Sequence, residues 1–219
     1  TPFSRIKSVF ADITEDDARA KGYIKGNVKK EEVFTLLKRT TTPQTVYKKQ
    51  KMDRDDIIDI TDFDVVAWIR GEMRIMLDEE IARAILIGDG RAAVSDDKIS
   101  EDHIRPIYTD ADLFSIKELV TYQAGASEDS KAKSYIRAAV KARKNYKGSG
   151  NPVFYTTEDV LTDMLLLEDN MGHRLYKSEA ELATAMRVSK IITVQVMEGV
   201  QRTVDNVVRD LVGIIVNLS

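Results

Sequence analysis

Apolar residues recur at helical spacing from Thr61 to Gly90, with no proline among them. This pattern predicts one helix of roughly 26 residues, about 39 Å long at ~1.5 Å of rise per residue. Thr61 and Asp64 are spaced as a capping box, and Gly88 supplies a left-handed helix end. Because this helix would be about twice the usual length or more, we expect it to support other parts of the molecule.

The apolar side of this predicted helix changes half-way along it. At about 100° per residue, Trp68 lies on an arc opposite Arg74, whereas Ile81 lies on the side that was polar in the first half. We therefore predict that Trp68 and Ile81 are both buried, but against different neighbours. The helix would then bridge two packing layers.

After residue 100 the pattern predicts short alternating elements. Thr156 with Asp159, and Ser178 with Glu181, have the spacing of capping boxes at helix starts. The order of elements predicts a mixed lobe within an α+β fold. Helices are expected at 110–125, 130–145, 156–168 and 178–186, and strands at 104–108, 153–157, 190–196 and 210–218.

The two ends of the chain have a different character. Residues 1–56 contain few long apolar runs and many Lys, Thr and Asp residues. Such a segment buries little surface by itself, so it is predicted to form an arm followed by an extended hairpin. The predicted strand 210–218 has no turn after it, and we therefore expect the C-terminus to be incomplete.

The composition argues against several classes of function. The formal charge is −3, from 33 basic and 36 acidic residues, so the chain as a whole does not attract a polyanion. Zero cysteines exclude disulfides, thiolate nucleophiles and cysteine-ligated metals. His103 and His173 are far apart and form no helical two-histidine metal motif. No apolar run suits a membrane span or a signal peptide. We therefore expect no cofactor, no membrane partner and no enzymatic activity.

The densest acidic cluster precedes the long helix. Carboxylate oxygens are preferred ligands of hard divalent cations, so this cluster could serve a metal-dependent enzyme. Its spacing lacks the Gly and Glu of an EF-hand, and the helix macrodipole also favours acidic residues near a helix N-terminus. A role of these aspartates at the start of the helix is therefore favoured over a metal site. The cluster includes Asp53, Asp55, Asp56 and Asp59.

The turn after the long helix consists of Gly88, Asp89 and Gly90. Glycines of this kind cradle phosphate when they precede a helix, where free N–H groups point outward. Here they follow a helix, and the carbonyl groups at a helix C-terminus repel anions. The position of these glycines after the helix favours a structural helix end with a tight turn.

A basic run without an acidic residue extends from Lys131 to Gly150. On a helix, its cations would line one side and its apolar residues the other, which is ordinary amphipathicity. A solvated or subunit-facing surface is favoured over a nucleic-acid site, because few aromatic residues are interleaved. The cations that could contact a subunit or an anion are Lys133, Arg137, Lys141 and Lys144.

Two longer segments carry a family resemblance. The first is DRDDIIDITDFDVVAWIRGEMRIMLDEEIARAILIGDGR, residues 53–91, and the second is NPVFYTTEDVLTDMLLLEDNMGHRLY, residues 151–176. In their order, separation and end motifs they resemble the major capsid proteins of tailed bacteriophages of the Hong Kong 97 type. In that family the first segment contains a long spine helix. The second contains a strand, a short capped helix and an Asp-Asn-x-Gly turn.

The resemblance implies a division of the chain into the parts of the Hong Kong 97 fold. Residues 1–22 would be an N-terminal arm, and 23–56 an E-loop that reaches over a neighbouring subunit. Residues 57–108 would form the peripheral (P) domain with the spine helix, and 109–198 the axial (A) domain, a mixed α/β lobe. Residues 199–219 would include a strand returning toward the P domain, which further C-terminal strands would complete.

The resemblance also implies a function. The chain would be a structural subunit that assembles into the icosahedral head shell of a tailed phage or prophage around double-stranded DNA. Its partners would be copies of itself, in hexamers and pentamers, with scaffolding or protease proteins during assembly and at most weak contact with DNA. It would be assembled in the bacterial cytoplasm and reside in the virion. An encapsulin-type compartment, which has the same fold, and a metal-dependent enzyme remain alternatives.

Overall fold

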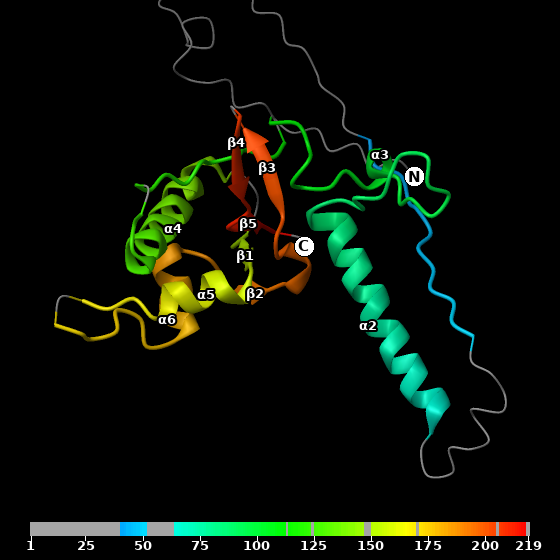
Figure 1. The fold of residues 1–219 in the computed structure, drawn as a ribbon, viewed down its shortest axis with the longest axis horizontal. Coiled ribbons are helices and arrows are strands. Elements are labelled where there is room, and N and C mark those ends of the chain that lie inside the picture. Colours follow the sequence, from blue (N-terminus) through cyan, green and yellow to red (C-terminus); the bar gives the residue numbers. More distant parts are fainter. Residues whose placement is uncertain are drawn as a thin grey trace, which may run out of the picture.

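The computed structural model describes part of the chain, in which helices and two small sheets form an α+β arrangement (Figure 1). The predicted arm, most of the predicted E-loop, the aspartate cluster before the long helix and Thr61 lie outside the described residues. The described residues are 40–51, 64–112, 114–123, 125–146, 150–169, 171–204 and 206–217.

The long helix, α2 (Val65–Leu86), has 22 residues and begins after Asp64. The Asp64 side chain accepts a hydrogen bond from the Ala67 backbone N–H at 3.0 Å, which satisfies one free donor of the first turn. The prediction that Thr61 is the N-cap is wrong, because Asp64 occupies that position itself rather than the third helical position of a capping box.

The end of α2 is the one that the sequence predicts. The backbone N–H groups of Ile87 and Gly88 both donate to the Arg83 carbonyl at 2.9 Å. Gly88 has a φ of 112°, which confirms a glycine end with positive φ. The chain then forms a loop and one short helical turn, α3 (Glu101–Ile104).

The segment after α3 completes the end of α2. The N–H groups of Ile107 and Tyr108 donate to the carbonyls of Ile85 and Leu86, at 3.0 and 2.9 Å. Both carbonyls belong to the last turn of α2, where they have no partner within the helix. The prediction of a strand at 104–108 is therefore wrong, because these amides bond to a helix terminus instead of a sheet.

Three short strands form the central sheet, in the order β2 (Ile191–Thr193), β1 (Val153–Thr156) and β5 (Gly213–Val216). β2 runs parallel to β1 and β5 runs antiparallel to it. Side chains alternate between the two faces of such a sheet, so Phe154 belongs to one hydrophobic cluster and Ile214 to another. These strands lie within the predicted ranges 153–157, 190–196 and 210–218.

The larger cluster lies between the sheet and three helices, α4 (Glu128–Ala142), α5 (Glu158–Leu165) and α6 (Glu179–Met186), all within or near the predicted ranges (Figure 1). A short 3-10 turn, η1 (Arg143–Asn145), continues α4. The buried residues of this cluster are Ala132, Ala139, Phe154, Leu161, Met164, Leu167, Leu182, Ala183, Met186 and Val188.

A smaller cluster on the opposite face connects the sheet to α2. Leu86 of α2 and Met197 of the 3-10 turn η2 (Gln195–Met197) bury their side chains with Ile214 of β5. Figure 1 shows the rest of α2 pointing away from the lobe that contains the sheet. The lobe therefore holds the C-terminal end of α2 and leaves its middle exposed.

A two-stranded hairpin precedes β5 and was not predicted. β3 (Gln201–Val204) pairs antiparallel with β4 (Val207–Asp210), and Val204 faces Val207 in the register. The connection contains Asn206 at a φ of 62°, a conformation that asparagine tolerates better than most residues. Valines on both sides of a two-residue Asp-Asn turn were the signal for this hairpin.

The predicted helix at 110–125 is absent from the described residues of that segment. A single turn forms, in which Phe114 and Ser115 donate to the Ala111 carbonyl. The Lys117 ammonium then bonds to the Asp110 carbonyl at 2.8 Å and holds the chain in a loop. The apolar side chains beyond it remain about half exposed, so no packing supports a helix here.

The two predicted capping boxes of the lobe have different outcomes. Ser178 accepts a hydrogen bond from the Glu181 N–H at 3.4 Å and begins α6, as predicted. Thr156 does not cap α5, because its buried hydroxyl donates to the Val212 carbonyl at 2.7 Å. Thr157 is the N-cap residue of α5 instead, without a side-chain hydrogen bond.

The predicted burial of Trp68 and Ile81 is also wrong, since they are 49% and 38% exposed. The buried residues of α2 are Val65, Ala84 and Leu86. The two packing layers that were expected along α2 are not supplied by the described part of a single chain.

Candidate functional site

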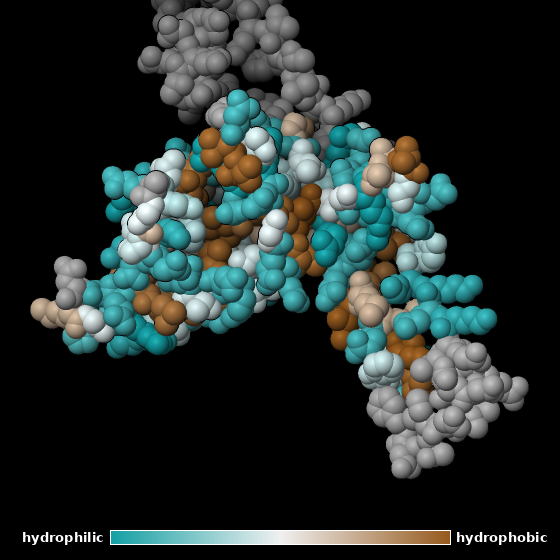
Figure 2. All heavy atoms as spheres, in the orientation of Figure 1, coloured by the Kyte–Doolittle hydropathy of each residue, from teal (hydrophilic) through white to brown (hydrophobic). Residues whose placement is uncertain are grey.

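Large apolar side chains are exposed along the projecting part of α2. Val66 is 52% exposed, Ile75 55%, Met76 40% and Ile81 38%. At about 100° per residue these positions lie on different sides of the helix rather than on one stripe. Figure 2 shows hydrophobic residues along this projection, among polar ones. A helix that is apolar on several sides is typical of one surrounded by other segments.

The turn after α2 is held by a buried carboxylate. The Asp89 side chain is buried, and its Oδ1 lies 2.6 Å from Nη1 of Arg91. Nη2 of Arg91 lies 3.0 Å from Oε1 of Glu80 on α2. Arg91 therefore joins the turn back to the helix and fixes the direction in which the chain leaves it.

A second carboxylate occupies the same turn. The Gly90 N–H donates to Oε1 of Glu101 at 3.5 Å, and the Lys98 ammonium lies 3.4 Å from the same oxygen. A phosphate at this place would meet the carboxylates of Asp89 and Glu101, which repel it. The geometry agrees with a structural helix end at Gly88, Asp89 and Gly90, and not with a phosphate cradle.

The predicted basic residues share one side of α4. The Ser127 hydroxyl caps this helix by accepting from the Ser130 N–H at 3.4 Å. The side chains of Lys133, Arg137 and Lys141 are exposed and stand at successive four-residue steps, and Lys144 of η1 is exposed as well. Lys133, Arg137 and Lys141, but not Lys144, line an open hollow of about 350 Å³ with apolar walls, called the basic groove below. Its lining residues are Lys133, Ile136, Arg137, Val140, Lys141, Leu167, Leu175 and Tyr176.

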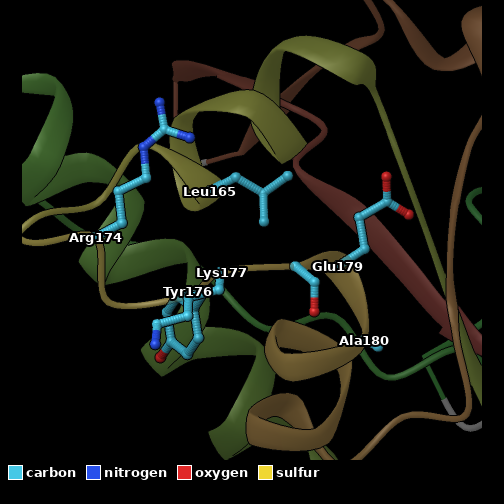
Figure 3. Close-up of a pocket in the computed structure, with 7 residues that line it drawn as sticks. Leu165, Arg174, Tyr176, Lys177, Glu179 and Ala180 are labelled. Atoms are coloured by element: carbon cyan, nitrogen blue, oxygen red, sulfur yellow. The ribbon is translucent and has the colours of Figure 1, made fainter.

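A second open hollow, of about 560 Å³, lies next to the basic groove and shares Tyr176 with it. Figure 3 shows its lining, with the side chains of Arg174 and Glu179 on opposite sides of Leu165. It contains opposite charges and no arrangement of a nucleophile, a base and a proton donor. We assign it no chemistry.

The turn between α5 and α6 is organised by one carboxylate. Oδ1 of Asp169 accepts from the N–H groups of Met171 and His173, at 2.7 and 3.0 Å. These hydrogen bonds, from His173 first and then Met171, hold the pKa of Asp169 below its usual value. Gly172 has a φ of 79° and allows the tight reversal. The turn presents Met171 at 84% exposure.

The remaining candidates do not form a chemical site. His173 is exposed and its Nδ1 lies 3.5 Å from Oδ2 of Asp169, while His103 belongs to α3 on another part of the molecule. Nowhere in the part that the structure covers do three His, Cys, Asp or Glu side chains come together as a metal site. The aspartates from Asp53 to Asp59 lie outside that part, so the structure does not test them.

Comparison with models of protein families, with curated proteins and with solved structures found no match for the chain. None of the helices in the described ranges combines the length and apolar character needed to cross a membrane. The candidate functional features are the exposed apolar side chains of α2 and the exposed cations of α4.

The sequence pattern missed the most informative of these features. It identified the cations of α4 but assigned the apolar residues of α2 to a core within one chain. The signal was present in α2 itself, because the apolar residues Val66 and Ile75 stand nine residues apart, on opposite sides of a single helix. A core on one side of a helix cannot bury both.

Proposed function

We propose that this protein is a structural subunit that assembles with copies of itself into a closed shell, the icosahedral head of a tailed phage or prophage. Its fold would be of the Hong Kong 97 type, and its place the virion after assembly in the bacterial cytoplasm. Copies in hexamers and pentamers would be its partners. The proposal joins the resemblance of residues 53–91 and 151–176 to one structural observation.

That observation is the projecting helix α2 with exposed apolar side chains on several sides. Burying an isoleucine side chain contributes about 1.5–3 kcal/mol, and Ile75 is 55% exposed, so about 1 kcal/mol remains available there. Three further side chains, Val66, Met76 and Ile81, are exposed to a similar degree. Contacts between copies of the chain would bury these residues, and repeated contacts of this kind build shells.

Electron microscopy and sedimentation of the full-length protein, expressed alone or with the product of the gene upstream, test the proposal. Closed particles of uniform size are expected. Ile75→Lys should abolish them while the unassembled chain stays folded, because lysine is a good helix former at an exposed position. The control is Glu79→Gln on α2, which changes the net charge by the same +1 as Ile75→Lys and should assemble normally. A wild-type protein that stays monomeric at high concentration contradicts the proposal.

The same experiment separates the alternatives. Particles that copurify with an enzyme cargo, and a gene neighbourhood without portal or terminase genes, would identify an encapsulin-type compartment. A metal-dependent enzyme would instead bind Mg²⁺ or Mn²⁺ stoichiometrically and lose that binding in Asp55→Asn. Among the residues that the structure describes, no cluster of possible metal ligands favours the enzyme.

A further inference from the structure

Helix α4 has two chemically different sides. Residues two apart on an α-helix point about 160° away from each other. Lys133 and Arg137 therefore lie nearly opposite Lys131 and Tyr135, respectively. The buried Ala132 attaches α4 to the core between these sides. Both sides are at the surface of the lobe, facing in different directions.

One side is the basic groove. No ion pair within the described residues involves Lys133, Arg137 or Lys141. The walls of the groove are apolar, with Ile136 and Val140 from α4 and others from the segment after α5. The groove thus offers uncompensated positive charge around an apolar surface.

The other side combines aromatic rings with negative charge. The rings of Tyr122 and Tyr135 meet edge to face, with their centroids 6.3 Å apart. Tyr122 is 47% exposed. The pKa of Tyr135 is raised, first by burial and then by Tyr122 and nearby carboxylates. Glu128 and Tyr135 stand seven residues apart on one side of α4, and Asp159 and Asp163 stand four residues apart on α5, which contacts α4. We call this surface the acidic patch: Tyr122, Glu128, Tyr135, Asp159, Asp163 and Asp210.

The negative charge of the acidic patch is only partly compensated. Lys131 lies 3.4 Å from Oε1 of Glu128 and lowers the pKa of Asp163. The pKa of Asp163 is nevertheless raised, by burial and then by Glu128 and Asp159. Around Asp163 the effect of the like charges exceeds that of Lys131, which favours the approach of further positive charge.

We propose that the basic groove of one copy of the chain binds the acidic patch of the next copy. This inference rests on the proposed function and specifies one of its contacts. The two surfaces lie on opposite sides of one helix, so the contact joins unlike surfaces head to tail. Contacts of this type close into a ring when the rotation from one copy to the next is a whole fraction of a full turn.

The chemistry of the two surfaces is complementary in detail. Arg137 can form paired hydrogen bonds with a carboxylate such as that of Asp163. Tyrosine rings can pack on the apolar walls formed by Ile136 and Val140 and lie against the cations. A nucleic acid would satisfy the cations but not the apolar walls, and it would be repelled by the acidic patch of the same lobe.

Charge reversal tests this contact. The groove variant carries Arg137→Glu and Lys141→Glu, the patch variant carries Asp159→Lys and Asp163→Lys, and a combined variant carries all four changes. The control, Lys177→Glu with Lys190→Glu, changes two exposed lysines outside both surfaces. Assembly is followed by sedimentation and electron microscopy, and the fold of each unassembled variant by far-UV circular dichroism.

We expect the groove variant and the patch variant each to weaken association by about tenfold or more, because like charges then face each other. The combined variant should restore assembly, and the control should match the wild type. A mixture of the two single-surface variants should restore association in rings with an even number of subunits, because the two variants must alternate for unlike charges to face each other. Restoration separates a direct contact from a folding defect, since a misfolded chain is not rescued by a second reversal.

Three results would overturn the inference. Wild-type assembly by both single-surface variants would show that the two surfaces do not meet, while leaving the proposed shell intact. Failure of the combined variant and of the mixture to assemble would exclude the pairing. Loss of binding to a DNA oligonucleotide in the groove variant, with normal assembly, would identify a nucleic-acid surface instead. A wild-type chain that never associates refutes the proposed function itself.

Discussion

Replacing Gly88 by alanine should destabilise the chain through the end of α2. Gly88 has a φ of 112°, a region that side-chain-bearing residues rarely adopt, and such strain costs about 1–3 kcal/mol. An added Cβ would also lie 3.1 Å from Oε1 of Glu101 and 3.4 Å from Cγ of Pro106. The Glu101 side chain can rotate away, so the backbone strain dominates. Gly88→Val should cost more, because a branched side chain is less tolerant of positive φ.

The matched control is Gly71→Ala in the middle of the same helix. An added Cβ there meets nothing within 4 Å, and alanine is a better helix former than glycine by about 0.5–1 kcal/mol. The two alanine variants should therefore shift the unfolding free energy in opposite directions. Denaturant unfolding of the dilute, unassembled chain, followed by far-UV circular dichroism, measures both. Equal stability of Gly88→Ala and the wild type would refute the strained helix end at Gly88.

Three further outcomes follow from the lobe. Gly213→Ala should destabilise by about 1–3 kcal/mol, because its Cβ would overlap the Phe154 ring; an unchanged denaturation midpoint contradicts this packing. Thr156→Val should cost about 1–3 kcal/mol in the same assay, because a carbonyl loses its buried donor; no loss would mean that water or another group replaces the hydroxyl. The pKa of Asp169 is lowered by backbone hydrogen bonds, first from His173. The ionised carboxylate therefore stabilises the fold above the unfolded-state pKa, and this stabilisation is lost as pH falls through the folded-state pKa. An ordinary aspartate midpoint in an NMR titration would contradict these bonds.

Local signals predicted the elements that carry their own caps. Ser178 begins α6, and Gly88 ends α2, because each satisfies backbone groups within a few residues of itself. The strand at Val153–Thr156 was also predicted, since a short run rich in aromatic and β-branched residues favours a buried strand. For these elements the deciding interactions are close in sequence.

The failures involve interactions between distant residues. The segment around Ile107 has the composition of a strand, but its amides bond to the end of α2, about twenty residues earlier. Thr156 has the spacing of a cap, but its hydroxyl bonds to Val212. The predicted helix at 110–125 had caps and periodicity, yet its side chains Ile116, Leu119 and Tyr122 remain about half exposed. The cations of the basic groove were predicted, because they stand in one row on α4. The acidic patch was not predicted, because it depends on a contact between Tyr122 and Tyr135, which come from different segments of the chain.

Helix α2 is joined to the lobe near one end, through Leu86, Met197 and Ile214. Its 22 residues give a lever about 33 Å long at ~1.5 Å per residue. A rotation of about 10° at that small joint displaces the far end of the helix by about 6 Å, with little change in the core of the lobe. In the proposed shell, such a rotation would let one sequence fit neighbours at different angles, as a closed surface of changing curvature requires from identical building blocks.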